Sequence, residues 1–437
     1  MEVSRNKEVP VGNAWNRSKT QITIGFIFLI LLFVWGIHLN AVKPALAMHL
    51  LAGVMMGYAL SRSRFGFAGG IKRIYVRGEG SLTKALLLMF GLTMIVTMGI
   101  QWFSAQAGAI PNFLSTDGQN VIPGTQNVEP ADLGVIVGGF LFGVGMIFSG
   151  GCASGTLTDM GEGEGRAWLT IPFFIIGSIP GELAMYGVQT SSLGKISARV
   201  YLPDVFGYVG ALLVSIAGLL FIYWLVVRYE EKRKKAGTYM DPVSDWEDFE
   251  KPIGEEDIRP TAGQKMYHHL FVERWSFMKG ALVVAFAWLF ILVSQHKSWG
   301  VTTPFSTLSV YVLEKFGVTF TNPRLVELSD KVSGGLLQDG GTIRNLGLVA
   351  GALLTFLLAG RFRFKTDFQW RDSMYFIFGG LLMGFGARFA RGCNAGALYS
   401  GISTFSLSGW VFLVAMTLGG IFALKTFAGK ACTLPKK

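Results

Sequence analysis

Two of the three cysteines stand in matching local sequences, with one glycine directly before and another three residues after. The first set is Gly151, Cys152 and Gly155, and the second is Gly392, Cys393 and Gly396. A thiol is a weak, polarizable hydrogen-bond donor, whereas a thiolate is a nucleophile and a metal ligand. The sequence has no CxxC motif and no His/Cys cluster with metal-ligand spacing. Zinc and a disulfide scaffold are therefore disfavoured, and we expect no cofactor.

The likeness between the two cysteine regions extends over about twenty residues. At a constant offset of 241, identical positions include Gly138, Gly139, Gly143, Gly145 and Leu157, which match Gly379, Gly380, Gly384, Gly386 and Leu398. A lone buried cysteine is usually a small apolar filler, and glycines at such spacing usually serve helix packing. Duplication favours a functional role for Cys152 and Cys393, whereas the unmatched Cys432 is interpreted as filler.

Polar side chains accompany both cysteines. Ser154 and Asn394 can donate hydrogen bonds beside the thiols. Arg388 and Arg391 lie inside or at the end of an apolar run, where arginine is costly unless it meets an anion, a carboxylate or water. The two arginines are either snorkelling anchors or a positive mouth for an anionic substrate. Arg62 and Arg64 are interpreted as plain cytoplasmic anchors.

The composition indicates elements that lie in a membrane. Of 437 residues, 51% are apolar and 15% are charged, against about 25% charged in soluble domains. The runs that carry the apolar excess are 21–39, 45–60, 85–102, 134–149, 167–187, 205–227, 277–295, 344–360, 374–390 and 407–427. We predict an all-α, polytopic membrane protein with about ten spanning helices, and short runs beside glycine clusters predict additional short re-entrant helices.

Loop charges predict the orientation. Residues 61–84 carry six basic side chains against Glu79 alone, whereas 103–133 carries three acids and no Lys or Arg. The positive-inside rule then places 61–84 and both termini in the cytoplasm. The predicted parts are a tail at 1–20, a first membrane half at 21–227, a solvated cytoplasmic linker at 228–276, a second membrane half at 277–427 and a tail at 428–437.

This topology threads the two cysteine segments through the membrane in opposite directions. Inverted repeats with glycine-interrupted helices are typical of transporters whose site lies near the bilayer midplane. The net charge of +11 comes mostly from short loops beside apolar runs, where basic residues contact lipid headgroups. We therefore expect a lipid bilayer around the protein and no nucleic acid as a partner.

Residues 379–410, GGLLMGFGARFARGCNAGALYSGISTFSLSGW, resemble the sulfur-transport domain of the YeeE/YedE family of bacterial inner-membrane proteins. Residues 138–157, GGFLFGVGMIFSGGCASGTL, resemble its other copy. The resemblance covers about 45–227 and 277–427 and is greatest to the longer YedE-like branch. It implies an hourglass of long and short helices with Cys152 and Cys393 at the constriction, uptake of thiosulfate or a related sulfur or selenium compound, and a TusA-like sulfur carrier as a partner.

One departure from the family pattern concerns a third cysteine. Thiosulfate-transporting members carry an SRFC-type motif, and here the stretch reads Ser63-Arg64-Phe65-Gly66. A relay of three cysteines is therefore in doubt, and thiosulfate is less favoured as the specific substrate.

The function predicted from these features is that of an inner-membrane transporter rather than an enzyme. It would pass a thiosulfate-like anion along protonated thiols by hydrogen bonding, without ATP because no P-loop is present. A covalent persulfide shuttle is a competing mechanism. Two other classes stay open: a membrane thiol oxidoreductase or sulfurtransferase, and a scaffold that recruits a soluble sulfur carrier.

Overall fold

A computed structural model describes residues 18–192, 194, 197–241, 246–247, 250–252 and 261–434 of the protein. Parts of four predicted segments lie outside the described residues. They are the N-terminal tail up to residue 17, positions 193 and 195–196 of the first membrane half, the linker positions 242–245, 248–249 and 253–260, and the last three residues of the C-terminal tail.

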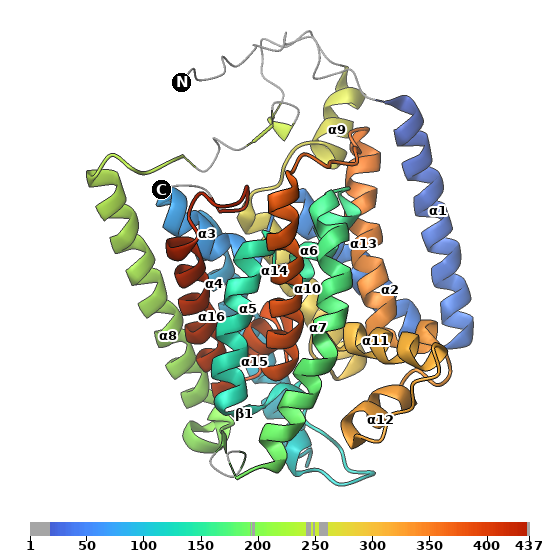
Figure 1. The fold of residues 1–437 in the computed structure, drawn as a ribbon, viewed down its shortest axis with the longest axis vertical. Helices are drawn as coiled ribbons and strands as arrows, with labels where there is room; N and C mark the ends of the chain where they lie inside the picture. The colour runs from blue at the N-terminus through green and yellow to red at the C-terminus, as the bar shows by residue number, and fades with distance from the viewer. Residues whose placement is uncertain are drawn as a thin grey trace.

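The described chain is almost entirely helical (Figure 1). The long helices are α1 (Lys19–Val42), α2 (Pro44–Arg62), α4 (Ser81–Gln106), α5 (Leu133–Ser149), α7 (Gly165–Thr190), α8 (Leu202–Lys235), α10 (Phe277–Gln295), α13 (Gly340–Ala359), α14 (Trp370–Phe389) and α16 (Leu407–Thr426). The shorter helices are α3 (Phe67–Arg77), α6 (Ala153–Gly161), α9 (Ala262–Phe271), α11 (Thr303–Lys315), α12 (Pro323–Asp330) and α15 (Gly401–Ser403). A π-type helix, η8 (Asn394–Ser400), leads into α15. The predicted all-α class is confirmed.

Little other regular structure occurs in the described ranges. Three short 3-10 turns are η2 (Asn112–Leu114), η3 (Thr125–Asn127) and η7 (Leu336–Gln338). Strands β1 (Pro130–Ala131) and β2 (Ala198–Arg199) pair antiparallel, with Pro130 opposite Arg199.

Each predicted apolar run lies within one long helix or passes its end by at most one residue. The helices themselves extend up to eight residues beyond the runs, as α8 does after residue 227. In the part of the chain that the structure describes, nine helices are long and apolar enough to cross a membrane. The count is ten if α14 and the helix across Asn394–Ser403, bent by 41° relative to each other, form one broken span. Large apolar side chains such as Phe33 on α1 and Phe221 on α8 are exposed, as lipid contact requires. The protein is a multi-pass membrane protein with about ten spans, as predicted.

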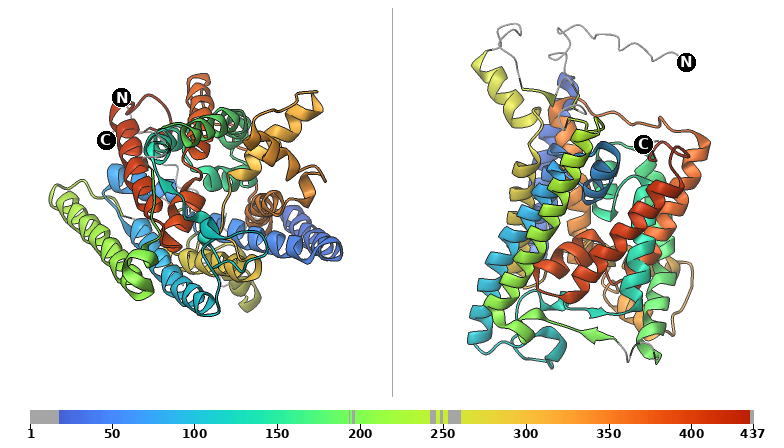
Figure 2. Two further views of the ribbon diagram at one scale, coloured as in Figure 1. Left: turned by 90° about the horizontal axis from the view of Figure 1, so that it is seen from below. Right: turned by 90° about the vertical axis from the view of Figure 1, so that its left-hand side faces the viewer.

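The helices form a bundle whose two ends differ. We call the end that holds α9 and the end of α16 the linker end, and the end that holds β1, β2 and α12 the strand end (Figures 1 and 2). Loop charges predict that the linker end is cytoplasmic. At the centre α5 packs against α14, while α16 packs on α5 and α7 packs on α14. Helices α1 and α8 lie at the periphery on opposite sides (Figure 2).

Glycines bring two of the central helices into backbone contact. A Cβ atom added at Gly53 or Gly57 of α2 would overlap the carbonyl oxygen of Arg344 or Leu348 on α13. In return, a Cβ at Gly351 of α13 would overlap the backbone of α2. Small residues at such spacing allow close approach in a membrane, where no hydrophobic force drives helices together. The pairing fixes α13, which carries charged groups described below.

We expect Gly57→Leu to destabilise the fold because its side chain would have to displace the α13 backbone. Overpacking of this kind costs about 1–3 kcal/mol, and more where backbone must move. The matched control is Gly99→Leu on α4, where an added Cβ meets no atom within 4 Å. Thermal stability of detergent-purified protein, followed by size-exclusion chromatography, should fall for Gly57→Leu and stay near wild type for Gly99→Leu. Equal stability of the two variants would contradict the packing described.

Candidate functional site

Cys152 lies where a helix is interrupted. Helix α5 ends at Ser149, Gly150 adopts the left-handed conformation (φ +80°), and Cys152 is the N-cap residue of α6. The backbone N–H of Gly155 donates to the Cys152 sulfur at 3.5 Å, and the Ser154 hydroxyl lies 3.3 Å from the same sulfur. The thiol therefore faces the positive end of a short helix.

Cys393 occupies the corresponding place after α14. The helix ends at Phe389, Arg391 is left-handed (φ +61°), and Cys393 is the N-cap residue of η8. Unlike Cys152, Cys393 accepts no side-chain capping hydrogen bond from this helix. Arg391 is the counterpart of Gly150 at the offset of 241 residues that relates the two cysteine regions. In both breaks, the residue two positions before the cysteine is therefore left-handed. Such a conformation is uncommon for a residue other than glycine.

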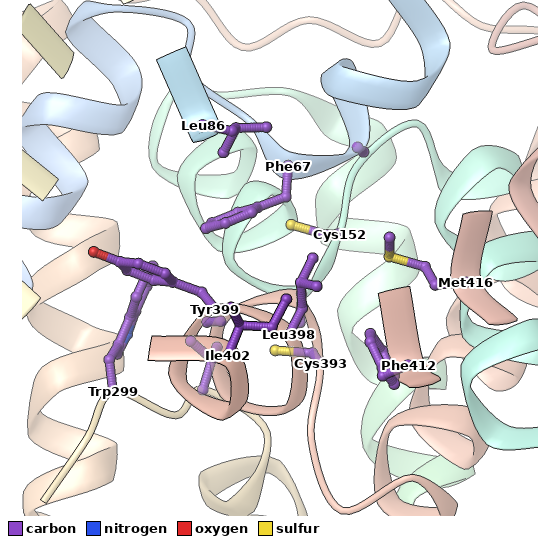
Figure 3. Close-up of a cluster of buried hydrophobic side chains, with 14 of the residues drawn as sticks. Phe67, Leu86, Cys152, Trp299, Cys393, Leu398, Tyr399, Ile402, Phe412 and Met416 are labelled. Carbon is purple, nitrogen blue, oxygen red and sulfur yellow. The ribbon is translucent and has the colours of Figure 1, made fainter. Parts of the chain in front are cut away.

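The structure brings both thiols into one buried cluster. Cys152 and Cys393 are 1% and 0% exposed, and both belong to the same set of packed apolar side chains. Figure 3 shows Cys152 beside Phe67 of α3, and Cys393 beside Leu398 of η8. Both cysteines therefore lie in the same buried core.

The glycines around each cysteine have two different tasks. A Cβ added at Gly392 would lie 2.5 Å from the backbone nitrogen of Ala397, so the turn before Cys393 requires glycine. A Cβ at Gly151 would meet Asp159 Oδ2 at 3.1 Å. By contrast, a Cβ at Gly155 would meet only the Cys152 sulfur at 3.6 Å, and one at Gly396 only Gly300 Cα at 3.8 Å. The glycines after the cysteines thus leave space beside the sulfurs.

Asn394 shares the buried setting of the thiols. Its side-chain nitrogen donates to the sulfur of Met146 at 3.3 Å, and its buried side-chain oxygen has no hydrogen-bond partner among the described residues. Within the same ranges, no group of three or more His, Cys, Asp or Glu side chains could hold a metal ion.

A polar cavity of about 870 Å³, here called the vestibule, opens at the strand end and reaches Gly392 and Gly396. Its basic lining residues are Lys297, Arg324, Lys331, Arg344, Arg388 and Arg391, and its acidic ones are Glu129, Glu327 and Asp339. Six cationic groups against three acids give the vestibule a positive lining. Several of these cations are ion-paired with Glu182, Asp132 or Glu327, so the excess of positive charge is smaller than the number of basic lining residues.

Arg388 and Arg391 line the vestibule, but both are ion-paired. Arg388 Nε donates to Glu182 at 2.6 Å, and its Nη1 donates to the Thr302 hydroxyl at 3.0 Å. Arg391 holds both oxygens of Asp132, at 3.1 and 2.5 Å. Both arginine side chains are 5% exposed or less, so neither snorkels to a lipid headgroup. Each arginine is thus paired with a carboxylate. A carboxylate was one of the three partners expected from the sequence to offset the cost of a buried arginine, beside an anion and water.

The linker end is covered by ion pairs. Arg64, interpreted from the sequence as an anchor, contacts Glu162 at 2.6 Å and the linker residue Glu250 at 3.0 Å. Glu250 also lies 3.7 Å from Arg274. We call Arg64, Glu162, Glu250 and Arg274 the linker cluster. Glu250 is only 7% exposed, so the expectation of a fully solvated linker is wrong at this position, where basic partners offset the burial of the carboxylate.

Burial also affects an acid of the linker cluster directly. It raises the pKa of the Glu162 carboxyl to about 7, although Arg64 beside it acts in the opposite direction. Glu162 caps the far end of α6 from Cys152. The cluster therefore holds the short helix whose first turn surrounds the thiol.

Sequence reasoning missed Glu182, Arg344 and Glu250. The first two could have been found, because Glu182 lies inside the predicted run 167–187 and Arg344 begins the run 344–360. Ionisable residues inside a span are functional candidates by default. No sequence pattern distinguishes Glu250 from the other linker acids.

These features define a class of protein: a multi-pass membrane protein in which broken helices meet at two buried thiols below a positively lined cavity. The chain belongs to the sulphur transport (YeeE/YedE) family, whose family model matches residues 62–422. The resemblance stated from the sequence is confirmed.

Similar relatives come from several bacteria. "Thiosulfate transporter TsuA" of Escherichia coli strain K12 is 25% identical over 388 residues, which cover 85% of this chain and 91% of the relative. The protein of the same name from Spirochaeta thermophila is 25% identical, with 85% and 95% covered. "Probable transporter YedE" of Salmonella typhimurium is 25% identical over 51% of each chain.

Thiol accessibility gives a direct test of this geometry. We expect a bulky, membrane-impermeant maleimide to label Cys432, which is exposed, and to leave Cys152 and Cys393 unlabelled until the protein is denatured. Sealed vesicles of both orientations should show Cys432 reacting only from the linker end. Rapid labelling of either buried thiol in the native protein, read by mass spectrometry, would contradict the burial.

Removing the charge of Glu250 should loosen the linker end. Glu250→Gln deprives Arg64 and Arg274 of a shared carboxylate, so we expect a small, permeant maleimide to reach Cys152 several-fold faster while Cys393 is unaffected. Glu231→Gln on α8 is the matched control because Glu231 is exposed. Equal rates in the two variants would show that the linker cluster does not restrict access to Cys152.

Proposed function

We propose that the protein carries a thiosulfate-like anion, containing sulfur or selenium, inward across a bacterial inner membrane. The path runs from the vestibule past Cys393 and Cys152 toward the linker end. The observation that carries the proposal is the pair of matched thiols, each at the N-terminus of a short helix within a broken span. Membership of the sulphur transport family and relatives named thiosulfate transporters support this class of substrate.

An inverted repeat, with membrane halves at 21–227 and 277–427, is part of the proposal. Helices α5 and α6 before and after Cys152 would correspond to α14 and η8 around Cys393. The packing supports this correspondence, since α7 lies on α14 as α16 lies on α5. Left-handed residues at Gly150 and Arg391 mark the same step in both copies. Both termini would be cytoplasmic.

The thiols would act as neutral, soft hydrogen-bond donors. A protonated thiol can contact the sulfur or selenium of an anion without charge repulsion, whereas a thiolate would repel it. The positive ends of α6 and η8 would add attraction for negative charge. Several weak sites in series suit conduction because a single tight site would retain the anion. Besides the two cysteines, the proposed substrate-binding residues along the path are Gly151, Gly155, Gly392, Gly396, Ser154, Asn394, Arg388 and Arg391.

Passage requires movement around the thiols. Both sulfurs are buried and the vestibule ends at Gly392 and Gly396, so the route is closed between Cys393 and the linker end in this conformation. Phe67 and Leu398 flank the sulfurs and belong to the short helices α3 and η8 (Figure 3). Small displacements of these short helices would open the route with the long helices in place.

Gly66 bears on the choice of substrate. It is the N-cap residue of α3, and an added Cβ there meets no atom within 4 Å. A third thiol would therefore fit at this helix N-terminus, yet this chain has none. Two thiols would have to serve the whole path, which allows a substrate related to thiosulfate but not identical to it.

Uptake measurements on cysteine variants test the proposal. In proteoliposomes, we expect Cys152→Ala or Cys393→Ala to lower uptake of labelled thiosulfate by at least about tenfold, the loss that one hydrogen bond to a charged group can cause. Cys432→Ala is the matched control and should transport normally. A panel including selenite and sulfate would define the preferred substrate. Full transport by the double alanine variant would refute the role of the thiols.

Mass analysis of the same samples separates transport from thiol chemistry. A transporter that uses hydrogen bonding leaves Cys152 and Cys393 as free thiols after turnover with substrate. A persulfide or a disulfide on these residues would instead favour the sulfurtransferase or oxidoreductase class. Absence of uptake together with binding of a soluble sulfur carrier would favour the scaffold.

A further inference from the structure

Arg344 differs from the other arginines of the vestibule. It lies on α13 and is 7% exposed. Its Nη2 donates to the carbonyl of Gly300 at 2.7 Å and its Nη1 lies 3.4 Å from Nδ1 of His49. The guanidinium has five N–H donors, and its buried Nε has no hydrogen-bond partner among the residues that the structure describes. Arg344 is therefore a buried cation with unused donors.

The neighbouring arginines show what Arg344 lacks. Arg324 and Arg388 share the carboxylate of Glu182, and Arg391 is held by Asp132. Over the described ranges, no carboxylate lies within ion-pair distance of Arg344. Asp339, the N-cap residue of α13, is near enough for its charge to act on Arg344, but its Oδ2 accepts hydrogen bonds from the backbone and hydroxyl of Thr342 and forms no ion pair with the guanidinium. A buried arginine without a carboxylate is costly unless an anion or water meets it.

The place of Arg344 connects it to the thiol centre. Its contact residue Gly300 lies against Gly396, since a Cβ added at Gly396 would meet Gly300 Cα at 3.8 Å. Gly396 in turn lies in the first turn of η8, whose N-cap residue is Cys393. An anion in the deep part of the vestibule can therefore approach Arg344 on one side and the Cys393 centre on the other.

We propose that Arg344 binds the oxyanion end of the substrate at the floor of the vestibule and turns the softer end toward Cys393. This inference rests on the proposed function and extends it to a substrate class. The substrate would be a small anion with a hard, multi-oxygen group at one end and a polarizable sulfur or selenium atom at the other. A guanidinium offers parallel N–H donors that match such oxygens, and the thiol matches the soft atom.

The test is anion binding to the purified, full-length protein by isothermal titration with sodium thiosulfate and sodium sulfate. Arg344→Gln should weaken binding of both anions by about 10- to 100-fold, as expected for loss of charge-assisted hydrogen bonds. Arg344→Lys should retain part of the affinity because it keeps the charge but not the fork of donors. Arg199→Gln, which removes an exposed positive charge outside the vestibule, is the matched control and should bind as wild type.

A second variant guards against misfolding of Arg344→Gln. His49→Glu places a carboxylate beside the intact guanidinium, so it supplies the missing partner and should weaken binding of both anions without removing Arg344. Cys393→Ala should lower the affinity for thiosulfate while leaving that for sulfate unchanged, because only the soft end contacts the thiol. Folding of each variant is checked by size-exclusion chromatography.

The outcomes separate this inference from the proposed function. Wild-type affinity in both Arg344→Gln and His49→Glu, or no binding of either anion by the wild type, overturns the role of Arg344. Loss of transport in the cysteine variants would still support the function in that case. Conversely, anion binding that depends on Arg344 without any uptake in proteoliposomes supports the binding site and refutes transport.

Discussion

The fold depends on satisfying the backbone where two helices break inside the membrane. Hydrocarbon offers no hydrogen bonds, so irregular backbone survives there only when the protein supplies partners. At the first break, Arg166 donates to the carbonyl of Ser149 at 2.9 Å, and Thr156 N donates to that of Cys152 at 2.7 Å. At the second, Ala397 N donates to the Cys393 carbonyl at 2.7 Å. Each break is thus closed by its own short helix, which leaves the thiol free to face the centre.

Charge inside the bundle follows the same principle. Glu182 is fully buried and lies between Arg388 and Arg324, while Asp132 both caps α5 and holds Arg391. These pairs tie the vestibule wall together across helices distant in sequence. Because paired arginines have their charge offset by carboxylates, they shape the cavity more than they attract ligands. A buried arginine without a paired carboxylate has a stronger requirement for an anion. For anion binding, the pairing of each basic residue therefore matters more than the number of basic residues.

The positions of the helices could be predicted from the sequence better than the ion-pair partners of the buried arginines. An apolar run has a length fixed by the thickness of the bilayer, so all ten long helices could be located from the sequence, although some extend four or more residues past the predicted run. The cysteine pair was found because its glycine frame repeats. The carboxylate partners of Arg388 and Arg391 could not be deduced, since Glu182 and Asp132 lie more than 200 residues away in the chain. The ion pair between Arg64 and Glu250 could not be deduced for the same reason, because Glu250 comes from a distant linker.

The two breaks share a backbone plan but differ in chemistry, and this difference suggests a direction of transport. The left-handed residue is Gly150 in the break near the linker end. The equivalent residue in the break near the strand end is Arg391. The strand end has a positively lined cavity, whereas the linker end is closed by a cluster in which Arg64 and Arg274 balance the acids Glu162 and Glu250. An anion would be attracted at the strand end, whereas the linker cluster offers no excess of positive charge. Under the proposed function, that asymmetry favours entry from the vestibule and disfavours return from the other side.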